Sequence, residues 1–376
     1  MHTFAVARAV HGIEPLVATE IRRSRLGVVR GVRHREVWFE ASSGADLLGL
    51  RTADDVLLAA AVVDGVGHGR SALRRLARAA RELDVGLLAR SGAGGPAKSG
   101  VGRSARSGDG LEVSASFVGR RNYTRFEIED AVGAELARPL RQPYHSRRDG
   151  VRPPQGAMSW RVTIEGDQAV IAVRLADRPL HRRSYKTASI RGTLHPPVAA
   201  AMAELARLGG ARTVLDPCCG AGTTLIEAHA LAPHLRLVGF DHDPAALEAA
   251  AANARTAGVR TAHAGAGAVE SPFGWAVADA GRIPVAGGTA DRVLVNPPWG
   301  RQVPPRGLLA RDGGLLWREV RRVLAADGLA VALVHDGIPH GFVVEEAVRV
   351  SLSGQHPVIA VLRKSNVRRP GRASPE

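Results

Sequence analysis

An Asn-Pro-Pro-Trp tetrapeptide, Asn296 to Trp299, follows a short apolar strand pattern at residues 291–296. Two prolines at the end of a strand hold the backbone extended and remove two N–H donors, so nearby carbonyl oxygens face outward. The Asn296 side-chain oxygen and the Pro297 carbonyl can then accept both hydrogens of a base amine, such as guanine N2 or adenine N6. Pro298 stiffens the bend, and Trp299 offers a face on which a base can stack. The pattern indicates methyl transfer to that amine; the structural alternative is a stiff loop with Trp299 in the core.

A glycine-containing turn after an earlier strand pattern, residues 212–216, is the candidate site for the methyl donor. The turn begins at Asp216, contains Gly220 and Gly222, and leads into a helical pattern. The two glycines allow a ligand to lie against the backbone. A dinucleotide fingerprint would have a third glycine where Leu225 stands, so the sequence disfavours pyrophosphate binding.

Two further carboxylates follow the next two strand patterns. Asp241 ends residues 235–241 and lies 25 residues after Asp216, near the spacing at which an acid accepts hydrogen bonds from ribose hydroxyls. Asp279 ends residues 275–279 and can accept a hydrogen bond from the adenine amine. Three acids around one glycine turn suit a cationic nucleoside, and S-adenosylmethionine fits that charge pattern through its sulfonium and α-amino groups. The predicted contacts are Asp216, Cys219, Gly220, Gly222, Thr223, Asp241, His242, Asp279 and Ala280.

The elements that must position these residues alternate between strand and helix from residue 195 onward, as in a doubly wound parallel sheet. Strands are predicted at 212–216, 235–241, 275–279, 291–296, 328–335 and 357–364, with a lead-in helix at 195–208. The carboxyl ends of parallel strands share one edge of the sheet, where ligands bind at the switch point. Each acid could instead be a solvated strand end or a helix cap, and Asp243 is expected to be a cap.

The first half of the chain is predicted to form two α+β units. The strand patterns cover 3–10, 35–40, 111–119, 157–166 and 168–176, and the helical patterns cover 14–27, 71–84 and 126–140. Residues 91–110 are rich in glycine and serine, which predicts a flexible insertion. Residues 367–376 have proline and charge without apolar content, which predicts a disordered tail.

Charge and cysteine content limit the partners and the compartment. The chain of 376 residues has 51 Lys and Arg against 36 Asp and Glu, a net charge of +15, with most of the excess in residues 1–190. Such an excess favours a polyanionic partner. The only two cysteines, Cys218 and Cys219, are adjacent, so they show no metal-ligand spacing and are expected to be reduced. With no leader-like or membrane-spanning apolar run, we expect a cytoplasmic protein without membrane or metal partners.

A basic turn in the first half could bind RNA. Arginine forks contact phosphates, and a tyrosine ring can stack on an unpaired base. A solvated surface turn is the alternative interpretation. The candidate RNA-binding residues are Arg120, Arg121, Asn122, Tyr123 and Arg125 in the turn, with Arg182 and Arg183 on the connector between the two halves.

Several segments together resemble a known enzyme family. DPCCGAGTTLIEA, GFDHDPAALEAAAANA, ADAGRIP and LVNPPWG, in this order, resemble class I methyltransferases that modify exocyclic amines of nucleic-acid bases. SASFVGRRNYTRFEIEDAVG, followed by WRVTIEGDQAVIAVRLADRPLHRRSY, resembles the THUMP RNA-binding domain. Residues 1–60 resemble the ferredoxin-like element that precedes it. The chain is therefore similar to the THUMP-containing tRNA guanine-N2-methyltransferases over nearly its whole length.

This resemblance implies a domain order and a substrate. The implied parts are a ferredoxin-like domain at 1–60, a THUMP-like domain at 61–178, a linker at 179–194 and a Rossmann-like class I methyltransferase domain at 195–366. The THUMP-like half would hold the 3′ end of tRNA while the catalytic half reaches a guanine nearby. Ribosomal RNA guanine-N2 and DNA adenine-N6 methylation are alternatives within the same chemistry, and a non-catalytic RNA-binding scaffold is the alternative of another class.

Overall fold

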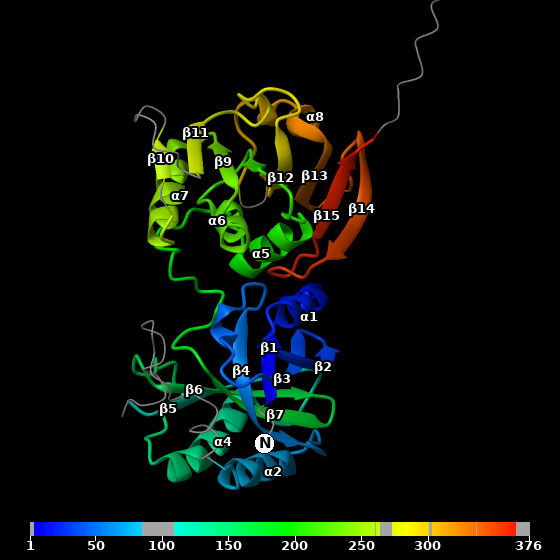
Figure 1. Cartoon of the computed structure of the whole chain (residues 1–376). Coiled ribbons are helices and arrows are strands. Elements are labelled where there is room, and N and C mark those ends of the chain that lie inside the picture. Colours follow the sequence, from blue (N-terminus) through cyan, green and yellow to red (C-terminus); the bar gives the residue numbers. More distant parts are fainter. Residues whose placement is uncertain are drawn as a thin grey trace, which may run out of the picture. The chain divides into compact units, whose positions relative to one another are not determined.

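A computed structural model describes residues 4–84, 109–259, 261–263, 273–300, 303–335 and 337–365. These residues form two compact units, of which the first comprises residues 1–9 and 17–181 and the second comprises 10–16 and 182–376 (Figure 1). The predicted tail at 367–376 and nearly all of the predicted insertion at 91–110 lie outside the described residues. No helix in the described ranges is long and apolar enough to cross a membrane.

The first unit is built on one seven-stranded sheet with the order β2-β3-β1-β4-β7-β6-β5. Its strands are β1 Phe4–Arg8, β2 Gly27–Arg33, β3 Glu36–Ala41, β4 Asp55–Val63, β5 Leu111–Phe117, β6 Met158–Glu165 and β7 Gln168–Arg174. The pairings are antiparallel except for β5 with β6. The helices are α1 Glu14–Arg23, α2 Ser71–Arg81 and α4 Arg125–Leu140, with a 3₁₀ turn η1 at Leu47–Gly49.

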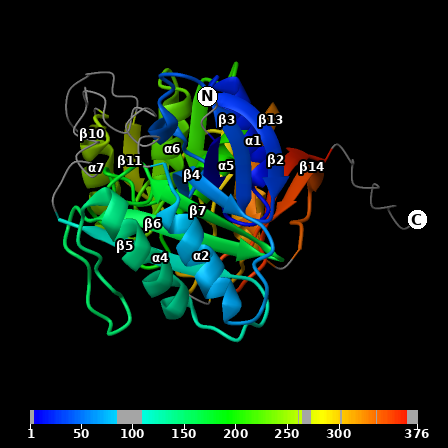
Figure 2. The same cartoon turned by 90° about the horizontal axis from the view of Figure 1, so that it is seen from below.

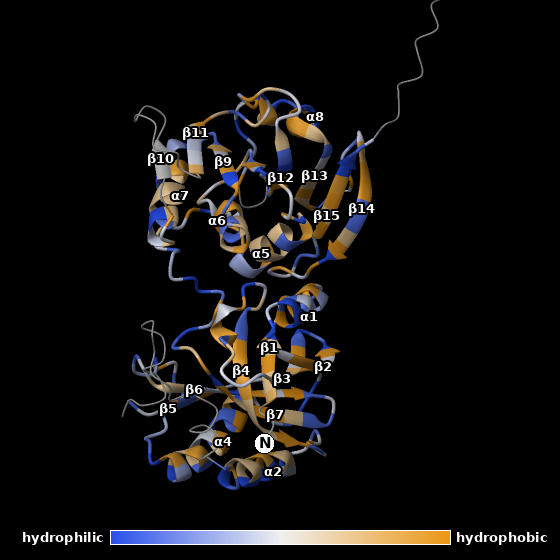
Figure 3. Ribbon diagram, in the orientation of Figure 1, coloured by the Kyte–Doolittle hydropathy of each residue, from blue (hydrophilic) through white to orange (hydrophobic). Residues whose placement is uncertain are grey.

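Local chemistry accounts for these elements. Thr124 and Glu127 form a reciprocal capping box at the start of α4, which supplies partners for two helix N–H groups. α2 and α4 pack side by side, as Figures 1 and 2 both show. Apolar residues dominate β1 and β4 in Figure 3, and both strands are largely buried in the middle of the sheet.

The predicted boundary between 1–60 and 61–178 falls inside β4. This strand pairs with β1 on one side and with β7 on the other, so one sheet is continuous across the boundary. The division into two domains therefore stays a prediction. The predicted helices and strands of this half are confirmed within a few residues at their ends, whereas β2 and β4 were not predicted from the sequence.

The second unit is built on an eight-stranded sheet with the order β10-β11-β9-β8-β12-β13-β15-β14. Its strands are β8 Thr213–Asp216, β9 Arg236–Asp241, β10 Thr261–His263, β11 Phe273–Val277, β12 Ala290–Val295, β13 Leu324–Val334, β14 Phe342–Arg349 and β15 Val358–Lys364. The strands from β10 to β13 are parallel, and β15 and β14 close the sheet as an antiparallel hairpin. The doubly wound sheet is thereby confirmed, while β10 and the edge strand β14 were not predicted.

Helices cover both faces of this sheet. They are α5 Pro196–Leu205, α6 Thr223–Leu231, α7 Pro244–Thr256 and α8 Gly314–Val323, with a 3₁₀ turn η2 at Gly307–Ala310. α8 buries Leu316 and Val320 in a cluster that includes Val293 of β12. Alternate residues of a strand face opposite sides, and Leu294 is fully buried as well, as expected for a parallel sheet between helical layers. The Asp243 side chain accepts a hydrogen bond from the Ala245 N–H and caps α7, as predicted.

The strand order creates a switch point at β8. From β8 the chain builds outward through β9 and β11 on one side, then crosses to β12 and β13 on the other. Ligands of doubly wound sheets bind beyond the carboxyl ends of the strands at such a point. Both predicted motifs follow strands at this switch point.

Candidate functional site

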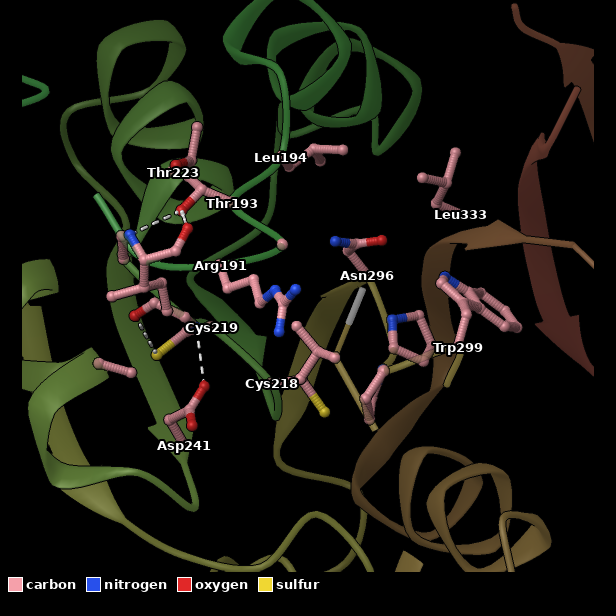
Figure 4. A pocket seen from close by; sticks show the side chains of 18 of the residues that line it. Arg191, Thr193, Leu194, Cys218, Cys219, Thr223, Asp241, Asn296, Trp299 and Leu333 are labelled. Atoms are coloured by element: carbon pink, nitrogen blue, oxygen red, sulfur yellow. Dashed lines mark hydrogen bonds between the residues drawn. The ribbon is translucent and has the colours of Figure 1, made fainter. Parts of the chain in front are cut away.

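A cavity of about 700 Å³ lies at the carboxyl edge of the second sheet. Residues that follow β8, β9, β11, β12 and β13 line it, together with the segment from Ile190 to His195 that precedes α5 (Figure 4). β8 and β12 are hydrogen-bonded neighbours, with Val293 opposite Leu215. The glycine turn after one strand and the Asn-Pro-Pro-Trp segment after the other therefore open into one cavity of a size suited to a nucleoside ligand.

Asp216 is the most buried acid in this cavity, with 1% of its surface exposed. Its carboxylate accepts hydrogen bonds from the Cys218 N–H at 2.9 Å and from the Thr224 hydroxyl. Within the described ranges, no cationic side chain forms an ion pair with it. Burial raises the pKa of Asp216 to about 7, since the two hydrogen bonds only partly offset the loss of hydration. The cavity thus contains a buried carboxyl group without a counter-charge.

The conformation of the turn after Asp216 depends on a glycine with positive φ and on packing against the Trp275 ring. Gly222 has a φ of +77°, and a Cβ there would lie 2.9 Å from the Trp275 ring and 3.1 Å from Ala250. Gly222 does not line the cavity. The missing side chain makes room for Trp275, which gives Gly222 a packing role, while its contact with the ligand stays a prediction.

Asp241 and Asp279 lie further along the same edge and orient the surrounding backbone. The Asp241 carboxylate accepts hydrogen bonds from the Gly220 N–H at 2.8 Å and from the Asp243 N–H at 3.0 Å. Asp279 accepts from the N–H groups of Gly281 and Leu308, both at 2.8 Å. Each carboxylate keeps further acceptor capacity, because an ionised carboxyl group can accept about four hydrogen bonds.

The other predicted cofactor contacts also line the cavity. They are Cys219, Gly220, Thr223, His242 and Ala280. Cys219 is buried, and burial raises the pKa of its thiol, which agrees with a packed rather than a reactive cysteine. The Thr223 hydroxyl oxygen is buried and has no hydrogen-bond partner in the described part of the chain. A buried hydroxyl without a partner at a cavity wall favours a polar ligand there.

The four residues of the predicted catalytic segment all line the cavity. Asn296 is half-buried, and its side chain points into the open space in Figure 4; no described residue hydrogen-bonds to it. The Trp299 ring packs on the buried cluster of the sheet and meets His335 edge-on, with ring centroids 4.9 Å apart. The Trp299 indole N–H is buried without a partner among the described residues. Trp299 therefore combines both alternatives considered from the sequence, since it packs on the core and also forms part of the cavity wall.

The basic turn of the first unit is only partly available to a partner. Tyr123 is 3% exposed, donates a hydrogen bond from its hydroxyl to the Gly67 carbonyl, and packs edge-on against Phe117. Arg121 donates to the carbonyls of Val66 and Gly67. The prediction that Tyr123 stacks on a base is therefore wrong for this conformation, because the ring is used to hold the turn.

Three residues of that turn remain on the surface: Arg120, Asn122 and Arg125 are exposed. On the connector, Arg182 is exposed, whereas the Arg183 side chain is only 9% exposed and pairs with fully buried Glu227 at 2.9 Å. The Tyr185 hydroxyl donates to the same carboxylate at 2.8 Å. The structure thus gives Arg183 a buried structural contact in place of the predicted RNA contact.

Sequence reasoning assigned residues 179–194 to a linker and missed their part in the cavity. Lys186, Arg191 and Leu194 line it. The Thr187 and Ala188 N–H groups donate to buried Asn253 of α7, which attaches the segment to the second unit. A run of mixed polar residues without periodicity does not reveal this packing. His335, which follows β13, is a further wall residue that the sequence did not single out.

The second sheet has six neighbouring parallel strands and a terminal antiparallel hairpin, and the cavity lies at its switch point. This arrangement defines a class I methyltransferase domain. The family model for the RMKL-like methyltransferase domain matches residues 183–338. A tRNA (guanine(6)-N2)-methyltransferase of Thermus thermophilus is 32% identical over 267 residues, covering 68% of this chain and 72% of the relative. The chain therefore belongs to the family of S-adenosylmethionine-dependent RNA guanine-N2-methyltransferases.

Solved structures and a longer relative agree with this assignment. The crystal structure of TrmN from Thermus thermophilus matches with a TM-score of 0.74 and 28% identity, covering 97% of this chain and 100% of that one. SMU.472, a putative methyltransferase complexed with SAH, matches with a TM-score of 0.69 at 17% identity, which shows a shared fold. The U6 snRNA (guanine-N(2))-methyltransferase THUMPD2 of Bos taurus is 31% identical over 233 residues; the chain covers 43% of its length.

Proposed function

We propose that this chain transfers a methyl group from S-adenosylmethionine to the N2 amine of a guanosine in tRNA, and that guanosine 6 is its target. The observation that carries the proposal is the pairing of β8 with β12, which brings the Asp216 turn and the Asn296 segment into one cavity. The Thermus thermophilus relative, which is named for guanine 6 of tRNA, supports the choice of nucleotide. This role fits the cytoplasmic location expected from the sequence.

The cavity wall fits the cofactor. Asp216 supplies a buried carboxylate for the α-ammonium group, and this pairing would ionise a carboxyl group whose pKa lies at about 7. The Thr223 hydroxyl, which has no partner in the described ranges, supplies a further polar contact at the same end. Asp241 and Asp279 would accept hydrogen bonds from the ribose hydroxyls and the adenine amine. When bound, S-adenosylmethionine supplies an electrophilic methyl group on a sulfonium.

The chain's own residues would prepare the amine. The Asn296 side-chain oxygen and the Pro297 carbonyl accept the two N2 hydrogens, which holds the nitrogen toward the methyl donor. As the nitrogen becomes cationic in the transition state, both contacts strengthen. Pro298 keeps the segment stiff, and Trp299 provides a wall beside the extruded base. One amine proton is released to solvent once the new N–C bond has formed.

We further propose that the first unit binds the 3′ end and acceptor stem through exposed basic residues. The remaining candidates in the turn are Arg120, Asn122 and Arg125, joined by Arg182 on the connector. Arginine forks at such positions contact phosphates rather than read sequence. Their contribution should therefore depend strongly on salt and weakly on the bases.

The decisive experiment combines cofactor binding with product analysis. The full chain is titrated with S-adenosylmethionine by calorimetry and is then incubated with tRNA transcripts that carry G or A at position 6. Nucleoside mass spectrometry should find N2-methylguanosine only in the G6 transcript. N6-methyladenosine, or binding without any methylated nucleoside, would contradict the proposal; methylation of G at another position would correct the target nucleotide alone.

A further inference from the structure

The charged groups on the cavity wall are unevenly matched. Four carboxylates lie there, those of Asp216, Asp241, Asp243 and Asp279, and the cofactor's sulfonium and α-ammonium groups can balance part of this negative charge. The α-carboxylate of the same ligand needs the opposite charge. Among the described residues, the cationic side chains that line the cavity are those of Lys186, Arg191 and Arg306.

Arg191 differs from the arginines of this unit that are paired within the fold. Arg183 and Arg322, for example, form ion pairs with Glu227 and Glu319. No residue in the described ranges forms a hydrogen bond or an ion pair with the Arg191 guanidinium, and its side chain is exposed. In Figure 4 the guanidinium points into the cavity, in the space between Cys218 and Asn296.

The backbone that carries Arg191 is held firmly against the glycine turn. The Thr193 hydroxyl donates to the Ile190 carbonyl at 2.6 Å and accepts from the Ile190 N–H at 3.2 Å. Ile190 packs over Gly220, and a Cβ at Gly192 would lie 2.5 Å from the Val303 side chain. The turn at Arg191 is therefore positioned by packing on both sides, so its guanidinium is presented to the same end of the cavity as the turn that follows Asp216.

We propose that Arg191 binds the α-carboxylate of S-adenosylmethionine, while Asp216 binds the α-ammonium group. The inference rests on the proposed function of the cavity. A zwitterionic ligand end is bound most selectively by one anion and one cation, and a planar guanidinium can form two parallel hydrogen bonds with a carboxylate. Charge complementarity of this kind determines selectivity, so the enzyme should distinguish ligands by their carboxylate.

Arg306 is a less suitable candidate for this role. It directly precedes Gly307, where a Cβ would lie 2.0 Å from the Asp279 carboxylate, so it belongs to the opposite, adenine-facing end of the cavity. It serves instead as the matched control: a second exposed cavity arginine for which the described residues show no ion pair.

The test compares two ligands that differ only in the carboxylate. The full chain and its Arg191→Ala, Arg191→Lys and Arg306→Ala variants are titrated by calorimetry with S-adenosylmethionine and with decarboxylated S-adenosylmethionine. The unmodified chain should bind the carboxylated ligand about 10- to 100-fold more tightly, which is the range for a hydrogen-bonded charge pair. Arg191→Ala should bring this ratio close to one by weakening the carboxylated ligand alone, Arg191→Lys should restore part of it, and Arg306→Ala should leave it unchanged.

Other results would overturn the proposal in recognisable ways. Equal weakening of both ligands by Arg191→Ala would show a general effect on the cavity, and unchanged affinity for both would show that Arg191 does not contact the cofactor. A raised KM for RNA with unchanged cofactor affinity would identify Arg191 as a phosphate contact instead. If the unmodified chain bound neither ligand, the proposed function itself would fail. Thermal melting of each variant confirms that it is folded.

Discussion

Asp216→Asn should stabilise the protein without ligand and at the same time weaken cofactor binding. Asp216 is 1% exposed and its pKa is raised to about 7, whereas an unfolded aspartate has a pKa of about 3.9. Between these values the folded state binds more protons than the unfolded state, so the free energy of unfolding falls as the pH rises. The contribution is fully present below about pH 4 and is lost above about pH 7.

The magnitude follows from the size of the pKa rise. Three pH units at 1.36 kcal/mol each give an upper limit of about 4 kcal/mol at pH 8. An asparagine cannot ionise, and its amide can still accept from the Cys218 N–H and donate to the Thr224 hydroxyl. Asp216→Asn should therefore raise the melting temperature of the second unit at pH 8 by up to roughly 10 °C and change it little at pH 4.

Differential scanning calorimetry at pH 4, 6 and 8 measures this effect, with Asp243→Asn as a matched control. Asp243 is an exposed helix cap, and asparagine caps about as well, so the control should change the melting temperature little at any pH. Titration of Asp216→Asn with S-adenosylmethionine should show affinity lowered by at least about 10-fold. A destabilised Asp216→Asn protein at pH 8, or one with normal cofactor affinity, would refute the reasoning.

Three further changes test other parts of the structure. Asn296→Ala should lower kcat by about 10²- to 10³-fold in a tRNA methylation assay and leave the Kd for S-adenosylmethionine nearly unchanged, because one amine acceptor is lost in the transition state; full activity would exclude the amine-holding role. Combined Arg120→Ala and Arg125→Ala substitutions should raise the Kd for tRNA and reduce the slope of log K against log salt by roughly 1–2, as measured by filter binding. An unchanged slope would place the RNA elsewhere. Glu227→Ala should cost about 3–5 kcal/mol in urea unfolding, because it removes the fully buried carboxylate that pairs with Arg183. Glu345→Ala, at the more exposed ion pairs with Arg207 and Arg363, should cost less than about 1 kcal/mol.

Local sequence patterns were sufficient to predict most of the helices and strands of the second unit. The strand patterns at 212–216 and 291–296 became β8 and β12, because short apolar runs bounded by turn residues carry their structure in neighbouring positions. The cap at Asp243 could be predicted for the same reason. In contrast, the residues of β4 form an apolar run without a clear period, which does not distinguish a buried strand from a helix. β14, whose residues are mostly polar or exposed, gave no apolar alternation either.

The sequence by itself determined which residues could carry the chemistry: a carboxylate before a glycine turn, and an amide before two prolines. The tertiary structure alone decided which of the remaining polar residues are available to a ligand. It buries Tyr123, pairs Arg183 with Glu227, turns Gly222 toward Trp275, and brings the supposed linker residue Arg191 into the cavity. The physical reason is that residue type and local spacing are encoded along the chain, whereas burial and pairing depend on partners tens of residues away that only folding brings into contact.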